Sequence, residues 1–116
     1  MTLQELKAEI DIDIDGSLAR FSNFEPMYLK YLKRFINEPT YEALEKAVQE
    51  QDFKGIESGA HTMKGIAGNL GLTALVSDFN NIVKQVRAGN NEEALKLCAE
   101  VAPKVAQARA AISKLN

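Results

Sequence analysis

Two residues of this sequence, His61 and Lys64, have the chemistry and the spacing to act on one small anion. An imidazole is largely uncharged near neutral pH and can form a covalent bond to an electrophile without special activation. An ammonium group suits an anion, and phosphate is the obvious one. Residues three positions apart are neighbours on a helix, so Lys64 can reach whatever is attached to His61, the only histidine of the chain.

A helix over residues 52–70 would display these two side chains. Asp52 is placed to cap its first turn, and Gly71 is a natural stop. At about 100° per residue, one arc of this helix holds apolar residues at spacings of 4, 3, 4 and 3, namely Ile56, Ala60, Met63, Ala67 and Leu70. The opposite arc holds His61, Lys64, Gly65, Gly68 and Glu57. We therefore predict that His61 faces away from the core.

Gly65 and Gly68 are unusual on the outer side of a helix, where alanine is more stable by about 0.5–1 kcal/mol. Because glycine has no side chain, both positions leave the C-terminal side of His61 bare, and another protein could approach the imidazole there. Two structural interpretations stay open: a tolerated surface histidine, and glycines that allow close helix–helix contact. Glu57, four positions before His61, could orient the ring or Lys64, and with Gly65 and Gly68 it is a candidate partner-binding residue, although a solvated carboxylate is the simpler interpretation.

The elements that must position this helix are also predicted to be helical. Apolar residues recur at helical spacing along the chain, no segment reads convincingly as a strand, and the breaks are short. The pattern predicts an all-α fold, an up-down antiparallel four-helix bundle with a short N-terminal helical extension. We expect Pro103 to kink the last helix, which starts near Glu92, or to divide it in two.

Composition limits the classes of function. A length of 116 residues predicts one domain over residues 1–116. The net charge of −2, with Lys and Arg spread along the chain, argues against nucleic-acid binding. No apolar run approaches the roughly 20 residues of a membrane span, and the acidic N-terminus lacks the order of a secretory signal. The single cysteine, Cys98, is expected to be a small buried side chain, and we expect a cytoplasmic protein.

Two motifs suggest other chemistry and fail on inspection. The run from Asp11 to Gly16 matches the start of an EF-hand calcium loop, but Ser22 stands where the loop needs glutamate, so an acidic turn leading into a helix is the better interpretation. The spacing of Gly65, Gly68 and Gly71 fits neither a dinucleotide-binding loop nor a Walker loop. One histidine and one cysteine far apart in sequence make no metal site, so none is expected.

The segment around His61 resembles the signature of histidine-containing phosphotransfer (HPt) domains. The matching residues are Ala60-His61-Thr62-Met63-Lys64-Gly65, Gly68, Leu70-Gly71 and Leu75. An earlier stretch is similar to the lead-in of bacterial members: Ile12-Asp13, Leu18-Ala19-Arg20-Phe21, Tyr28-Leu29, Leu32 and Phe35. The resemblance covers roughly residues 12–86. One departure is Met63, where leucine is more usual, and this exchange conserves side-chain volume.

The resemblance implies a phosphorelay intermediate, not an enzyme with turnover of its own. Such domains accept a phosphoryl group from an aspartyl phosphate on a receiver domain and pass it to another receiver aspartate. By this resemblance His61 is the phosphorylated residue, Lys64 helps to hold the phosphoryl group, and Gly65 and Gly68 admit the receiver. The family also implies that the receiver supplies Mg²⁺, so this chain needs no cofactor of its own.

The implied partners are response-regulator receiver domains and a hybrid sensor histidine kinase. We expect a monomer, because the face around His61 must stay free. Two alternatives stay open. A non-phosphorylated helical adaptor could bind a signalling partner through the same face, although such a protein would ordinarily lack the histidine. The chain could also be the phosphotransfer domain of a larger hybrid or chemotaxis-type kinase, although the initiating Met1 fits a free-standing protein better.

Overall fold

The computed structural model describes residues 1–116, and all of its regular secondary structure is helical. In chain order the elements are α1 (Leu3–Leu6), α2 (Ile14–Arg20), α3 (Glu25–Arg34), the 3-10 helix η1 (Phe35–Asn37), α4 (Pro39–Gln49), α5 (Phe53–Leu70), α6 (Thr73–Arg87) and α7 (Asn91–Ile112). The predicted all-α class is therefore confirmed. Short connections make the successive helices α4 to α7 antiparallel neighbours.

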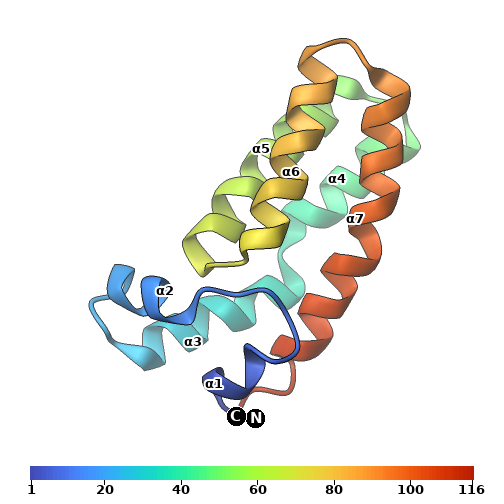
Figure 1. Cartoon of the computed structure of the whole chain (residues 1–116). Helices are drawn as coiled ribbons and strands as arrows, with labels where there is room; N and C mark the ends of the chain where they lie inside the picture. Colours follow the sequence, from blue (N-terminus) through green and yellow to red (C-terminus); the bar gives the residue numbers. More distant parts are fainter.

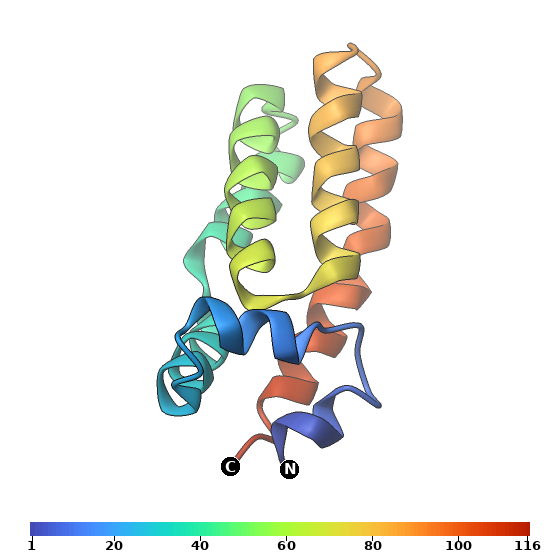
Figure 2. The same ribbon diagram turned by 60° about the vertical axis from the view of Figure 1, so that its left-hand side comes forward.

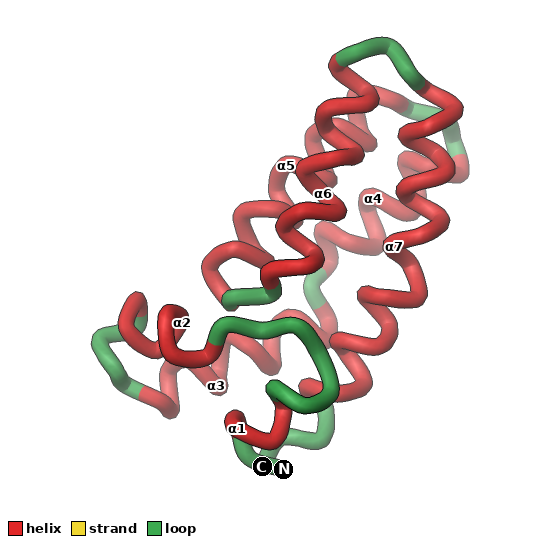
Figure 3. The backbone as a smooth tube through the Cα atoms, viewed as in Figure 1, coloured by secondary structure: helices red, strands yellow, loops and turns green.

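Helices α4 to α7 form the bundle, in which α5 packs against α4 and α6, and α6 packs against α7 (Figure 1). The three N-terminal helices lie at one end of the bundle, beside the turn between α5 and α6 and the last turns of α7 (Figure 2). The loop that joins α1 to α2 runs across this end (Figure 3). The chain termini also meet there, where the N–H of Asn116 donates to the carbonyl oxygen of Met1 at 3.2 Å.

One hydrophobic core of 27 buried residues extends from Leu3 to Leu115 and so includes both the bundle and the N-terminal helices. Cys98 belongs to this core, as expected, and burial raises the pKa of its thiol to about 11. A thiol of this kind is protonated near neutral pH and is a poor nucleophile. None of the helices is both long enough and apolar enough to cross a lipid bilayer.

Helix α7 is continuous through Pro103. The expectation that this proline divides the last helix is therefore wrong, and a kink stays a prediction. A proline removes the hydrogen bond to the carbonyl group four residues earlier, which here belongs to Ala99. Because Ala99 is exposed, water can satisfy that carbonyl group, and losing one bond does not end the helix.

The acidic run from Asp11 to Gly16 leads into α2, as its sequence indicates. The Asp13 carboxylate is the N-cap of this helix and accepts a hydrogen bond of 3.0 Å from the backbone N–H of Gly16. This bond satisfies one of the N–H groups that the first turn of a helix leaves free. The aspartate therefore has a structural role in starting α2.

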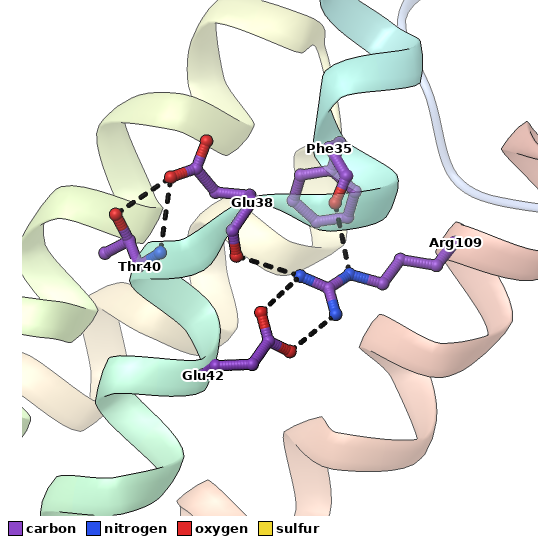
Figure 4. Close-up of polar contacts among 5 residues, drawn as sticks. All are labelled: Phe35, Glu38, Thr40, Glu42 and Arg109. Atoms are coloured by element: carbon purple, nitrogen blue, oxygen red, sulfur yellow. Dashed lines mark hydrogen bonds and ion pairs between the residues drawn. The ribbon is translucent and has the colours of Figure 1, made fainter.

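Arg109 of α7 joins this helix to η1 and α4 (Figure 4). Its Nη1 and Nη2 atoms donate to the two carboxylate oxygens of Glu42 at 2.8 and 3.3 Å. Its Nε donates to the carbonyl oxygen of Phe35, and its Nη2 to that of Glu38, both at 3.1 Å. The guanidinium also stacks 5.2 Å from the ring centroid of Tyr41. These contacts fix the position of α7 along its axis relative to η1 and α4.

Candidate functional site

Helix α5 has the two faces that its sequence predicts. The Asp52 carboxylate accepts a hydrogen bond of 3.1 Å from the N–H of Gly55, and Gly71 ends the helix in the left-handed conformation with φ of +78°. The buried residues of the helix are Ile56, Ala60, Met63, Ala67 and Leu70. These are the five positions assigned to the core by their spacing, so this prediction is confirmed.

His61 lies exposed on the outer face of α5. Lys64 follows one turn later and is half-buried along its length. The four salt bridges of the protein include neither residue, so no carboxylate neutralises the ammonium group of Lys64. An unpaired cation one turn from an exposed imidazole suits an anion attached to the ring.

The surface beyond His61 is bare because two positions lack side chains. A methyl group added at Gly65 would meet no neighbouring atom within 4 Å. A methyl group added at Gly68 would meet only Val76, at an ordinary contact distance of 3.8 Å. No helix packs closely over either glycine. The structure thus disfavours helix–helix contact as the reason for glycine at these two positions.

Close helix–helix contact instead explains Gly59, to which the sequence assigned no role. A methyl group there would lie 3.2 Å from Cβ and 3.4 Å from Cα of Leu44, and at Gly55 it would lie 3.0 Å from Cβ of Ala47. Both neighbours belong to α4. Helix α5 therefore uses glycines for two purposes: to approach α4 on one side and to leave its outer face open. Gly59 lies next to the buried Ala60, and this position in the sequence could have indicated that Gly59 packs against another helix.

Glu57 does not bond to His61 or Lys64. Its Oε2 atom accepts a hydrogen bond of 2.9 Å from Nε of Arg87, the last residue of α6. The two side chains are 35% and 61% exposed, so the carboxylate is neither free in solvent nor directed to the imidazole. The option that Glu57 orients the ring is not supported. Arg87, which no sequence pattern singles out, enters the neighbourhood of the site through this bond.

The N-terminal helices close the C-terminal end of α5. The Nη2 atom of Arg20 donates to the carbonyl oxygens of Gly68 at 3.0 Å and Asn69 at 3.4 Å. It also donates to the hydroxyl oxygen of Ser17 at 2.8 Å. The last carbonyl groups of a helix have no partner within the helix, so such bonds replace water. Arg20 thereby ties α2 to the helix that carries His61.

Tyr28 of α3 completes this closure inside the core. Its hydroxyl donates a buried hydrogen bond of 2.7 Å to the carbonyl oxygen of Leu70, and burial raises the pKa of the phenol. The backbone N–H of Asp13 donates to the carbonyl oxygen of Gly71 at 2.8 Å. Arg20 and Tyr28 both lie in the lead-in stretch, but only the folded chain shows what they bind.

Three large apolar side chains are exposed, and they lie at the N-cap of α3 and along this helix. They are Phe24, Met27 and Tyr31, with exposed fractions of 56%, 44% and 37%. Spacings of three and four place them on one side of the helix. Phe21 packs against Tyr31 with ring centroids 5.5 Å apart. A group of exposed apolar residues is typical of a surface that contacts another protein.

Comparison with known proteins places most of the bundle in one family. Residues 37–113, about two thirds of the chain, match the family model described as the Hpt domain. The match includes α4 to α7 and therefore His61 and Lys64, and it leaves out α1 to α3. Neither a curated protein nor a solved structure matches the chain significantly.

Proposed function

Because this chain belongs to the Hpt domain family, whose members carry phosphoryl groups in phosphorelays, we propose that His61 accepts a phosphoryl group from the aspartyl phosphate of one receiver domain and passes it to the aspartate of another. The observation that carries this proposal is an exposed imidazole with an unpaired cation and a bare surface on its C-terminal side. The protein acts as a carrier, and catalysis is shared with the receivers.

Transfer to His61 exchanges one bond for another. The Nε2 atom, which projects farther from the backbone than Nδ1, attacks the phosphorus atom. The N–P bond forms as the O–P bond to the aspartate breaks, and that electron pair stays on the aspartate carboxylate. The imidazole ring then carries a positive charge, which is removed when Nδ1 loses its proton to water. Phosphoryl transfer depends mainly on positioning and charge neutralisation, so an exposed imidazole needs few helpers on its own chain.

Lys64 is proposed to hold the phosphoryl group. It lies one helical turn from His61, and its ammonium group is in no salt bridge of the protein. A phosphoryl group on the ring adds negative charge that this ammonium can meet directly. Residues three apart on a helix have side chains close enough for such a contact.

The receiver is proposed to dock over the outer face of α5. Gly65 and Gly68 leave that face open beyond His61. Arg20 binds the carbonyl group of Gly68, so the end of α2 continues this surface toward the exposed side chains of Phe24 and Met27. A stable protein–protein interface covers about 800 Å² on each partner, which is enough to include both regions.

The Mg²⁺ that phosphoryl transfer requires is proposed to come from the receiver. No group of three or more His, Cys, Asp or Glu side chains in this chain could hold a metal ion. A metal held by the receiver would supply positive charge to the phosphoryl group during its transfer. This chain then contributes the nucleophile, the charge of Lys64 and the shape of the docking face. A monomer keeps that face free.

The test is transfer from a phosphorylated receiver of the same organism in the presence of Mg²⁺. The protein should acquire phosphate that is labile in acid and stable in base, as expected for phosphohistidine, and a His61→Gln variant should acquire none. Thermal unfolding of the variant should match that of the wild type, which excludes misfolding as the reason. Equal labelling of His61→Gln would overturn the proposal.

The alternative is a helical adaptor that binds its partner without phosphorylation. The presence of His61 together with Lys64 favours the phosphocarrier, because an adaptor has no use for a nucleophile beside a cation. The same experiment separates the two functions, since an adaptor would bind a receiver and take up no phosphate. Whether the hybrid sensor kinase is a separate partner or part of the same polypeptide does not alter this reaction.

A further inference from the structure

The guanidinium of Arg87 lies beside the helix face that carries His61. Its Nε atom donates to Oε2 of Glu57 at 2.9 Å, and this is the one side-chain hydrogen bond that Arg87 makes. The two terminal nitrogens of the guanidinium are therefore free to bind an anion. With 61% of its side chain exposed, Arg87 also has room to change its conformation.

The register of α5 and α6 pairs this guanidinium with Glu57, which lies one helical turn before His61. The helices are antiparallel, with Glu57 paired to Arg87 at one point and Gly68 facing Val76 at another. His61 lies between these points, four residues after Glu57. Residues four apart on a helix have Cβ atoms about 5–6 Å apart. A long arginine side chain bound to Glu57 can therefore reach an atom attached to His61.

The charges around His61 change when it is phosphorylated. A phosphoryl group brings a charge of about −1.5 to −2, and the carboxylate of Glu57 one turn away repels it. Arg87 neutralises that carboxylate in the unmodified protein. A guanidinium binds phosphate oxygens in pairs and does so more strongly than it binds one carboxylate oxygen at an exposed site. The phosphoryl group thus competes with Glu57 for Arg87.

Resting on the proposed function, we propose that Arg87 is a second cation for the phosphoryl group on His61. Glu57 positions Arg87: its carboxylate keeps the guanidinium beside the site when His61 is unmodified. When the phosphoryl group arrives, Glu57 shares the guanidinium with it or releases the guanidinium to it. Lys64 binds the phosphoryl group from the C-terminal side of His61, and Arg87 binds it from the N-terminal side. Together they compensate the added negative charge between two turns of α5.

The experiment measures the lifetime of phosphohistidine at neutral pH after labelling with phosphoramidate, a small phosphoryl donor that needs no receiver. Arg87→Ala should shorten the lifetime about two- to fivefold, the range expected for one partly exposed charge contact. Arg87→Lys should recover part of the loss, because it keeps the charge. Glu57→Gln should lengthen the lifetime, because it removes the repulsion and frees Arg87. The Nε–H signal of Arg87 in NMR spectra should shift on phosphorylation.

Lys104→Ala is the matched control, because it breaks a similar exposed ion pair, with Asp78, between α6 and α7. Its lifetime should equal that of the wild type. If the Glu57–Arg87 pair served only to brace α5 against α6, either variant would break it and both would change the lifetime in the same direction. That outcome, or an unchanged lifetime in Arg87→Ala, would overturn the inference. If the wild type takes no label from phosphoramidate or from a receiver, the proposed function fails first.

Discussion

Arg20 and Gly68, 48 positions apart in the sequence, are joined by a hydrogen bond of 3.0 Å from Nη2 of the arginine to the carbonyl oxygen of the glycine. The bond connects α2, which lies outside the matched family region, to the helix that carries His61. The arginine therefore binds a backbone carbonyl group in the last turn of α5, next to the bare surface beyond His61. The N-terminal helices are thus part of the support for the candidate site.

Replacing Arg20 by alanine should loosen the end of α5. The substitution removes three hydrogen bonds and leaves the carbonyl groups of Gly68 and Asn69 to water. We expect a loss of about 1–3 kcal/mol in the free energy of unfolding, measured with urea. Amide hydrogen exchange over residues 69–72 should also speed up. Lys30→Ala, which removes an exposed charge from α3, should change neither the free energy of unfolding nor the exchange rates. If Lys30→Ala has the same effects as Arg20→Ala, the loss of positive charge and not the bond to Gly68 is the cause.

Two glycine-to-alanine substitutions in α5 should have opposite effects on stability. Gly65→Ala should raise the free energy of unfolding by about 0.5–1 kcal/mol, because alanine favours a helix and the added methyl group meets nothing. Gly59→Ala should lower it by about 1 kcal/mol or more, because the methyl group would crowd Cβ of Leu44 at 3.2 Å. Urea unfolding of both variants measures the difference. A stabilising Gly59→Ala would show that α4 can move away at little cost.

A bulky side chain at Gly65 should block the receiver without affecting the imidazole. Gly65→Gln should slow transfer from a phosphorylated receiver by about tenfold or more, because a displacement of about 1 Å at the reacting atoms has effects of this size. Labelling by phosphoramidate should stay near the wild-type rate, since a small donor needs no docking surface. If both rates fall equally, the glycine affects the chemistry at His61 and not the approach of the partner.

Removing the charge of Lys64 should slow both reactions. Lys64→Ala takes away the cation next to the phosphoryl group, so we expect a loss of about two- to tenfold in labelling by a receiver and by phosphoramidate. Lys64→Arg should restore most of the rate because it keeps the positive charge. Rapid-quench labelling with each donor measures the rates. An unchanged time course in Lys64→Ala would make this residue an ordinary surface lysine.

The pair of Glu42 and Arg109 should make stability depend on pH in acid. The hydrogen bond from Arg109 lowers the pKa of the Glu42 carboxyl below its usual value of 4.5. The unfolded chain therefore takes up this proton at a higher pH than the folded protein. The contribution to stability is fully present above about pH 4.5 and is lost as the pH falls through the lowered pKa. Urea unfolding between pH 7 and pH 3 should show this loss.

Glu42→Gln is the variant that isolates this effect, because it keeps the shape of the side chain and cannot ionise. Its free energy of unfolding should fall less steeply in acid than that of the wild type. Arg109→Ala should cost more at every pH, since it also abandons the carbonyl groups of Phe35 and Glu38. Parallel pH profiles for wild type and Glu42→Gln would show that other carboxylates determine the acid response.

The sequence by itself determined the helix around His61 and its two faces. Helical periodicity is a local property, so the spacing of Ile56, Ala60 and Met63 is enough to define the core side. The cap at Asp52 and the stop at Gly71 are also local, because each depends on hydrogen bonds within one turn. These features placed His61 and Lys64 on the outer face before any tertiary contact was known.

Only the tertiary structure decided which of the neighbouring residues act with this helix. Arg20 reaches Gly68, Tyr28 reaches Leu70 and Arg87 reaches Glu57 across 30 to 48 positions of sequence. Nothing in a local pattern selects such partners, because each side chain has many polar groups within its possible reach. The same limit applies to the glycines: helical spacing separates Gly59 from the face of Gly65, but only the fold shows that α4 packs against Gly59 and that nothing packs against Gly65.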